Sequence, residues 1–186
     1  MLELVLLGVL NGMLEGFGKY VMENKIAPEL AELHIEGAPG WYARDKSGHV
    51  CTSAFAEGDM RALTAARQDS QARLARRIDE GIELAVADAY PRLDDPTERE
   101  IVARFREDPK LPLFLRREGK LTHQRYLEEE EIAFVRLCIP QERLAAYQRE
   151  RLMRIAGELL DYQGGRAFGE LDAETGGQAA PDDIFK

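Results

Sequence analysis

The sequence predicts an α+β fold, in which a mostly antiparallel sheet of about four to five strands is covered on one face by long helices. Short segments rich in β-branched and apolar residues are separated by turn residues, which is typical of hairpins. Long amphipathic patterns stand before and after these segments instead of alternating with them, which favours α+β over α/β. With 186 residues, 45% of them hydrophobic, the chain can form one domain with extensions.

Residues 1–23 are predicted to form an extra N-terminal helix, because apolar side chains recur there at steps of three and four. Gly8, Gly12 and Gly16 form a ridge of small residues, and Phe17 belongs to the apolar stripe. Such a ridge lets another helix approach closely, so these four residues are predicted to mediate self-association. A frayed terminal helix that tolerates its glycines is the alternative.

The same N-terminal segment is a marginal candidate for a membrane span, because charged and amide side chains interrupt its apolar residues. It has no basic start and no small-residue cleavage site, so it is not expected to act as a signal peptide. Membrane contact through residues 1–22 therefore stays an alternative to packing against protein.

A linker is expected at residues 24–40, where prolines and glycines interrupt any long element. The core domain is predicted to span residues 41–160 and to open with a hairpin. Its first strand starts at Trp41 and Tyr42, and its second follows the turn residues 45–48 with the sequence HVCTSAFA.

A long helix is predicted between Gly58 and Pro91, with Asp59 as its N-cap. The apolar stripe of this helix contains many small residues, so the helix can lie close to a sheet. The stripe consists of Leu63, Ala66, Ser70, Leu74, Ile78, Ile82, Ala85 and Ala89.

Arginines face mainly outward on the same helix. We predict that four of them, Arg67, Arg73, Arg76 and Arg77, form a lateral contact surface, because arginine is enriched at protein interfaces. The alternative is a solvated helix face, since acidic residues are interspersed among these arginines.

A second, shorter helix is predicted after Asp95, which caps it, with Pro96 at the first helical position and Asp108 near its end. Strands are expected near residues 113–117, 121–127 and 132–139. The last is apolar on both faces, which is typical of a central strand.

The chain is expected to end with a helix from Pro140 to about residue 160, followed by an extended tail over residues 161–186. The tail is rich in glycine and aspartate and has too few apolar residues to order itself.

The charge balance argues against nucleic acid as a partner. The formal net charge is −9, whereas nucleic-acid binders derive much of their affinity from basic residues. The three histidines lie far apart, and none has a metal-ligand spacing. We therefore expect no cofactor and no resident metal.

No catalytic residue is predicted. His49 and Cys51 share a face of a strand, but a cysteine nucleophile also needs an orienting group and an oxyanion donor. Four consecutive glutamates could bind a divalent cation, although such a run is more typical of a solvated turn. These are Glu128, Glu129, Glu130 and Glu131. A small enzyme or metal-binding protein that uses these residues stays an alternative hypothesis.

Cys51 and Cys138 both fall in predicted strands and could meet across the sheet. Two buried thiols are one interpretation. A disulfide is the other, and it requires an oxidising compartment.

The stretch from Trp41 to Ala89 resembles a family of small bacterial envelope lipoproteins, named for the twenty-kilodalton membrane-associated lipoprotein of Helicobacter. The resemblance extends over about two-thirds of the chain, because the strand-into-helix segment from Tyr126 to Leu152 has a similar layout. The residues that carry it are Pro39, Trp41, Ala54, Ala56, Gly58, Ala62, Ala66, Ala72, Leu74, Ala75 and Ile78.

The resemblance implies a compact α/β domain without enzymatic activity in the cell envelope, and some relatives build rings or discs around the flagellar motor. The chain differs from the family because it shows no lipobox cysteine and no signal peptide. We thus expect a structural protein that assembles with itself into a ring, disc or filament, together with other envelope or flagellar proteins. The expected location is periplasmic or outer-membrane associated; a cytoplasmic location and a membrane-tethered adaptor are the alternatives.

Overall fold

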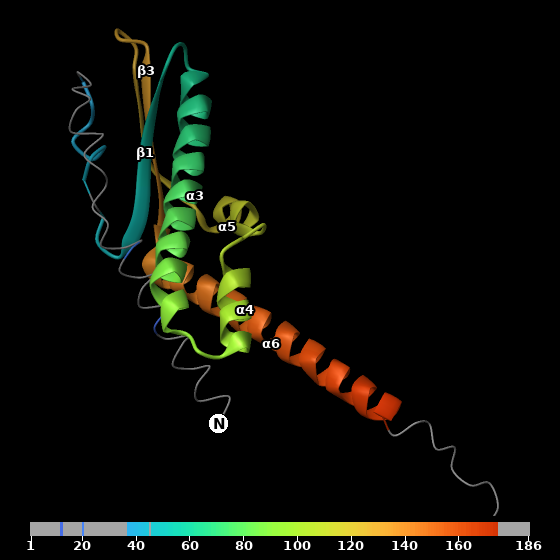
Figure 1. Ribbon diagram of the computed structural model, residues 1–186. Coiled ribbons are helices and arrows are strands. Elements are labelled where there is room, and N and C mark those ends of the chain that lie inside the picture. The colour runs from blue at the N-terminus through green and yellow to red at the C-terminus, as the bar shows by residue number, and fades with distance from the viewer. Residues whose placement is uncertain (1–11, 13–19, 21–36, 45, 175–186) are drawn as a thin grey trace, which may run out of the picture.

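The computed structural model of the chain describes residues 12, 20, 37–44 and 46–174 (Figure 1). It confirms the α+β fold. Within the described residues the sheet has three antiparallel strands, fewer than the four to five expected. In chain order the elements are β1 (His49–Glu57), α3 (Ala62–Ala89), the 3-10 helix η1 (Tyr90–Arg92), α4 (Pro96–Phe105), α5 (Leu111–Glu118), β2 (Lys120–Leu127), β3 (Ile132–Pro140) and α6 (Gln141–Glu174).

The sheet has the order β1-β3-β2, so the prediction that the last strand is central is confirmed. Alternate residues of β3 point to opposite faces. Ala133, Val135, Leu137 and Ile139 join the main hydrophobic core with the helices. The other face of β3 carries Phe134, Arg136 and Cys138, all of them buried.

Two predicted strands are wrong. Trp41 and Tyr42 form a turn, in which the Tyr42 N–H donates to the Pro39 carbonyl at 2.8 Å. A two-residue apolar segment beside proline and glycine is too short to hold a place in the sheet ladder. Residues 113–117 belong to α5, whose buried residues Leu111, Phe114 and Leu115 follow helical spacing.

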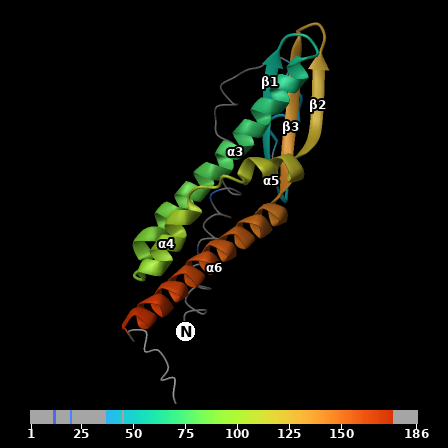
Figure 2. The same cartoon turned by 90° about the vertical axis from the view of Figure 1, so that its right-hand side faces the viewer.

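The long helix α3 runs beside the sheet and extends past its end (Figures 1 and 2). Its predicted stripe is largely buried, and a polar contact fixes it to β1: Ser70 Oγ donates to the Thr52 carbonyl at 2.8 Å, and Thr52 Oγ1 donates to the Ser70 carbonyl at 2.7 Å. Asp59 lies ahead of the N-cap, which is Arg61, and its carboxylate accepts the Arg61 N–H at 2.8 Å. Asp59 thus stabilises the turn before the helix.

The second predicted helix is confirmed as α4, with Asp95 as N-cap. The Asp95 side chain accepts from the backbone N–H groups of Thr97 and Glu98. The last helix continues to Glu174, well past the predicted end near residue 160. Residues 161–174 are therefore helical instead of extended, and the rest of the predicted tail lies outside the described residues.

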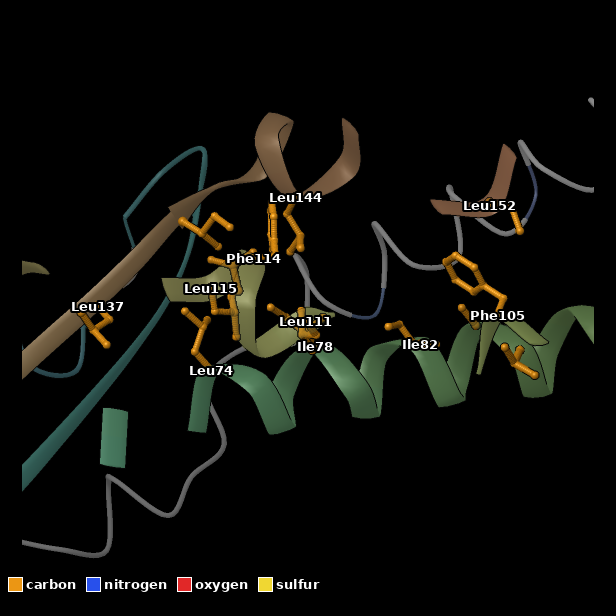
Figure 3. Packing of buried hydrophobic residues seen from close by; sticks show 14 of the residues in the cluster. Leu74, Ile78, Ile82, Phe105, Leu111, Phe114, Leu115, Leu137, Leu144 and Leu152 are labelled. Carbon is orange, nitrogen blue, oxygen red and sulfur yellow. The ribbon is translucent and has the colours of Figure 1, made fainter. Parts of the chain in front are cut away.

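The hydrophobic core lies between α3 and the elements that follow it. Side chains of α3 point toward those of α4, α5 and α6 (Figure 3). Leu152 of α6 lies near Phe105 of α4 at one end, and Leu144 lies near Phe114 of α5 in the middle (Figure 3). Truncating one such buried side chain typically costs about 2–5 kcal/mol.

Candidate functional site

Polar side chains interrupt the buried face of α6. Leu144, Leu152 and Leu159 form an apolar inner stripe against the core, but Gln148 and Arg151 occupy the same face and are also buried. Buried polar groups are costly unless they are hydrogen-bonded, so each requires a partner within the fold.

Arg151 holds the segment between α4 and α5. Its Nη2 donates to the carbonyl of Phe105 at 2.6 Å and also to that of Glu107. The guanidinium carbon lies 4.4 Å from the centroid of the Phe105 ring, within the range of a cation–π contact. Because Phe105 ends α4, the positive charge also lies at the negative end of that helix.

Asp108 is the counter-charge. Its Oδ2 lies 3.6 Å from Arg151 Nη1, with side-chain exposures of 1% and 3%. The Asp108 Oδ1 accepts from the Tyr147 hydroxyl at 3.0 Å and from the Lys110 N–H at 3.1 Å. We call Asp108, Tyr147, Gln148 and Arg151 the polar cluster; it ties α6 to the α4–α5 connection.

Burial and charge shift the titration of the polar cluster. Burial, together with the negative Asp108 and the hydrogen bond to it, raises the pKa of Tyr147. Burial lowers the pKa of Arg151, and the Asp108 carboxylate opposes that shift. On α3, loss of water and repulsion from Asp108 raise the pKa of Asp79.

Within the described residues, two atoms of the polar cluster have no hydrogen-bond partner: Asp108 Oδ2 and Gln148 Nε2. The geometry indicates a stabilising role, because both charged groups of the Asp108–Arg151 pair are buried and contact other protein atoms.

The opposite side of α6 exposes apolar residues. Met153 is 53% exposed and Leu160 is 38% exposed. Among the described residues, no atom lies within 4 Å of a Cβ atom added at Gly157, which is between them. The helix has 34 residues, ~51 Å, and extends past α4 (Figure 1). We call Met153, Gly157 and Leu160 the outer stripe.

The second face of the sheet is held by Arg136 and a disulfide. Arg136 donates to the Trp41 carbonyl at 3.0 Å and to the Arg44 carbonyl, so it fixes the turn at residues 41–44. Beside it, Cys51 and Cys138 are direct cross-strand partners of β1 and β3 and are joined by a disulfide. Of the two interpretations that the sequence leaves open, the structure therefore contains the disulfide.

The chain matches no protein-family model, and no curated protein or solved structure is significantly similar to it. The resemblance to envelope lipoproteins therefore depends on the sequence motifs alone, and membership of that family stays a prediction. What the chain does has to follow from its own geometry.

The four arginines of the contact surface predicted on α3 have different surroundings. Arg67 and Arg76 are exposed. Arg73 pairs with Asp69 of its own helix at 2.8 Å, and Arg77 donates to the Cys51 carbonyl at 3.1 Å. Two of the four arginines thus have contacts within the chain, which leaves Arg67 and Arg76 as the accessible pair.

The residues of the alternative enzyme hypothesis do not converge. The disulfide removes the free thiol of Cys51, and the His49 ring lies 3.0 Å from the Ser47 carbonyl. The four glutamates lie at the β2–β3 turn and are exposed. Among the described residues there is no group of three or more histidine, cysteine, aspartate or glutamate side chains that could hold a metal ion.

The predicted N-terminal interaction site falls mostly outside the described residues, which include neither Gly8, Gly16 nor Phe17. Gly12 is helical, and no atom of the described residues would lie within 4 Å of a Cβ atom added there. Tyr20 is helical and packs against the core. No helix in the described part of the chain is long and apolar enough to cross a membrane.

Proposed function

We propose that the chain is a non-enzymatic structural protein that assembles with itself, and that α6 is a contact element of the assembly. The observation that carries this proposal is the outer stripe. Met153 and Leu160 are large apolar side chains, exposed on a helix that extends past the body of the fold.

The inner stripe supports the same role. On the inner side of α6, Leu152 and Leu159 are buried, but Tyr162 at the next helical step is 61% exposed. The described body therefore covers the first part of α6 and leaves Leu160 and Tyr162 accessible. A helix with apolar residues on accessible faces is suited to packing against another helix.

The polar cluster supports the same role, because it holds α6 in a fixed direction relative to the body. Arg151 binds the end of α4 and the connection that follows it through two carbonyls. Such charged contacts fix the direction in which α6 leaves the body, and a contact element needs a defined direction to form a regular assembly.

The disulfide supports a location in the cell envelope. Disulfides persist in oxidising compartments such as the bacterial periplasm and are rare in the cytosol. The proposed location is therefore periplasmic or outer-membrane associated, as the resemblance implies.

Light scattering coupled to size exclusion, over a hundredfold range of concentration, tests the assembly. We expect species larger than the 21.0 kDa of one chain, with a mass that rises with concentration. A single 21.0 kDa species at every concentration would contradict the proposed function.

A further inference from the structure

The outer stripe has the spacing of a helix-pairing seam. Met153, Gly157 and Leu160 are separated by four and then three residues. Alternating steps of four and three residues keep one narrow stripe in line along a partner helix. At 100° per residue this stripe lies well away from Leu152, Ile155 and Leu159 on the inner side.

Large and very small residues alternate along the seam. If two copies of α6 run antiparallel, with residue 157 of one opposite residue 160 of the other, each Leu160 lies over the Gly157 of its partner. Met153 then lies opposite position 164, which is also glycine. A parallel pair would place Gly157 against Gly157 and Leu160 against Leu160, which leaves voids beside crowded layers.

Charge at the edge of the seam favours the same arrangement. Arg154 and Asp161 each follow a large residue of the seam by one position, and both are exposed. Residues at this position face one another across antiparallel helices, so Arg154 of each copy meets Asp161 of the other. In a parallel pair, Arg154 would instead approach Arg149 of its partner, and the two like charges would repel.

We infer that the partner of α6 is α6 of a second copy, bound antiparallel along the outer stripe about a twofold axis near residues 158–159. The inference rests on the proposed function and names its contact. The surface is self-complementary in size and in charge, as a twofold interface requires. Arg154 contacts Glu158 of its own helix at 3.2 Å, and this exposed pair is weak enough for Asp161 of the partner to share the arginine.

Charge exchange tests the register. In the full-length chain, we expect R154D and D161R each to weaken dimerisation at least fivefold, measured by sedimentation velocity over a concentration series. The double variant R154D/D161R restores the opposite charges across the axis, so its dissociation constant should return to within about twofold of the original. Equal weakening in the double variant overturns the inference.

A second variant separates contact from folding. Gly157→Leu adds a side chain where the structure has open space, so the monomer should keep its circular dichroism spectrum and melting temperature. The added side chain collides with Leu160 of the partner, and we expect dimerisation to fall at least tenfold. Glu80→Leu, a matched substitution at an exposed position of α3 and therefore outside α6, should leave dimerisation unchanged.

Cross-linking distinguishes the two directions. Antiparallel pairing places residue 153 opposite residue 164 and ~16 Å along the axis from residue 153 of the partner. M153C/G164C should therefore form a covalent dimer under mild oxidation, whereas M153C alone should not. A covalent dimer of M153C alone indicates parallel pairing and overturns the inference.

The outcomes separate the inference from the proposed function. If the unaltered chain assembles but G157L and R154D assemble equally well, self-assembly stands as proposed, but pairing through the outer stripe of α6 is wrong. If the unaltered chain stays monomeric at every concentration, as it would if another segment of the same chain covered the outer stripe, both are overturned.

Discussion

Replacing Arg151 by methionine should lower the free energy of unfolding, because a buried carboxylate and two backbone carbonyls depend on its guanidinium. The guanidinium is 3% exposed and pairs with Asp108, which is 1% exposed. It also donates to the carbonyls of Phe105 and Glu107. In Arg151→Met, the apolar stem is kept, but a buried carboxylate and two carbonyls lose a partner.

The expected loss of unfolding free energy follows from the burial of Asp108. Breaking a buried ion pair from one side typically costs about 3–5 kcal/mol, because an uncompensated charge stays inside the protein. Tyr147 and Lys110 still donate to the Asp108 carboxylate in the variant, so we expect a loss near the lower end, about 3 kcal/mol.

The double variant R151M/D108N is the control. Asparagine keeps an acceptor for the Tyr147 hydroxyl and removes the charge that Arg151→Met leaves behind. We expect the double variant to be about 1–2 kcal/mol more stable than R151M, because it no longer buries an unpaired charge. The recovered free energy measures the coupling between the two residues.

Urea unfolding at one fixed protein concentration provides the assay, with helical circular dichroism and the fluorescence of Trp41 as separate probes. Coincident transitions justify a two-state fit. A loss below about 1 kcal/mol for R151M, or a double variant less stable than R151M, would refute the account of the polar cluster as a buried ion pair.

Three further predictions address the sheet and α3. Replacing Cys51 and Cys138 by serine removes a cross-link between residues separated by 87 positions. The unfolded chain then gains conformational entropy, and the free energy of unfolding should fall by about 4–5 kcal/mol. Calorimetry with and without a reductant measures the loss. Burial raises the pKa of Asp79, so the folded protein binds this proton more tightly than the unfolded chain does, and the resulting stability is lost as pH rises through the folded pKa. Asp79→Asn should therefore raise stability at pH 7 but not at pH 3, which urea unfolding at both pH values checks. Tyr42 is buried, its pKa is raised to about 12 by burial, and its hydroxyl has no hydrogen-bond partner within the described residues; Tyr42→Phe should leave the melting temperature unchanged or raise it, with a gain of up to about 1 kcal/mol.

Local signals in the sequence were sufficient for much of the fold. Asp95 followed by Pro96 marked the start of α4, because a capping side chain and a preset φ angle act within one turn. The apolar segment at residues 132–139 marked the central strand, because a strand buried on both faces cannot alternate with polar residues.

The two wrong strands have different causes. Trp41 and Tyr42 are held in their turn partly by Arg136, which is distant in sequence. For α5, the density of apolar residues predicts a strand, but Leu111, Phe114 and Leu115 have the spacing of a helix, and this local spacing agrees with the structure.

The polar cluster was missed for a similar reason, although one signal was present. Gln148 and Arg151 fall on the apolar stripe of α6, and a polar residue at a core position predicts a buried partner. Nothing in the sequence identified that partner as Asp108, because it comes from the connection between two other helices.

A twofold pairing of α6 does not by itself produce a ring, disc or filament, because an isologous interface closes after two copies. A larger assembly therefore needs a second, different interface. Arg67 and Arg76 are exposed on α3, and Glu128, Glu129 and Glu130 are exposed at the β2–β3 turn, so the body offers charges of both signs away from α6. If these charges join one dimer to the next, salt should reduce the particle to a dimer without dissociating it further, because the α6 seam is mainly apolar and screening weakens exposed charge pairs first. Sedimentation at low and high ionic strength decides this point: direct conversion from large particles to monomers would show that the two interfaces are not separate.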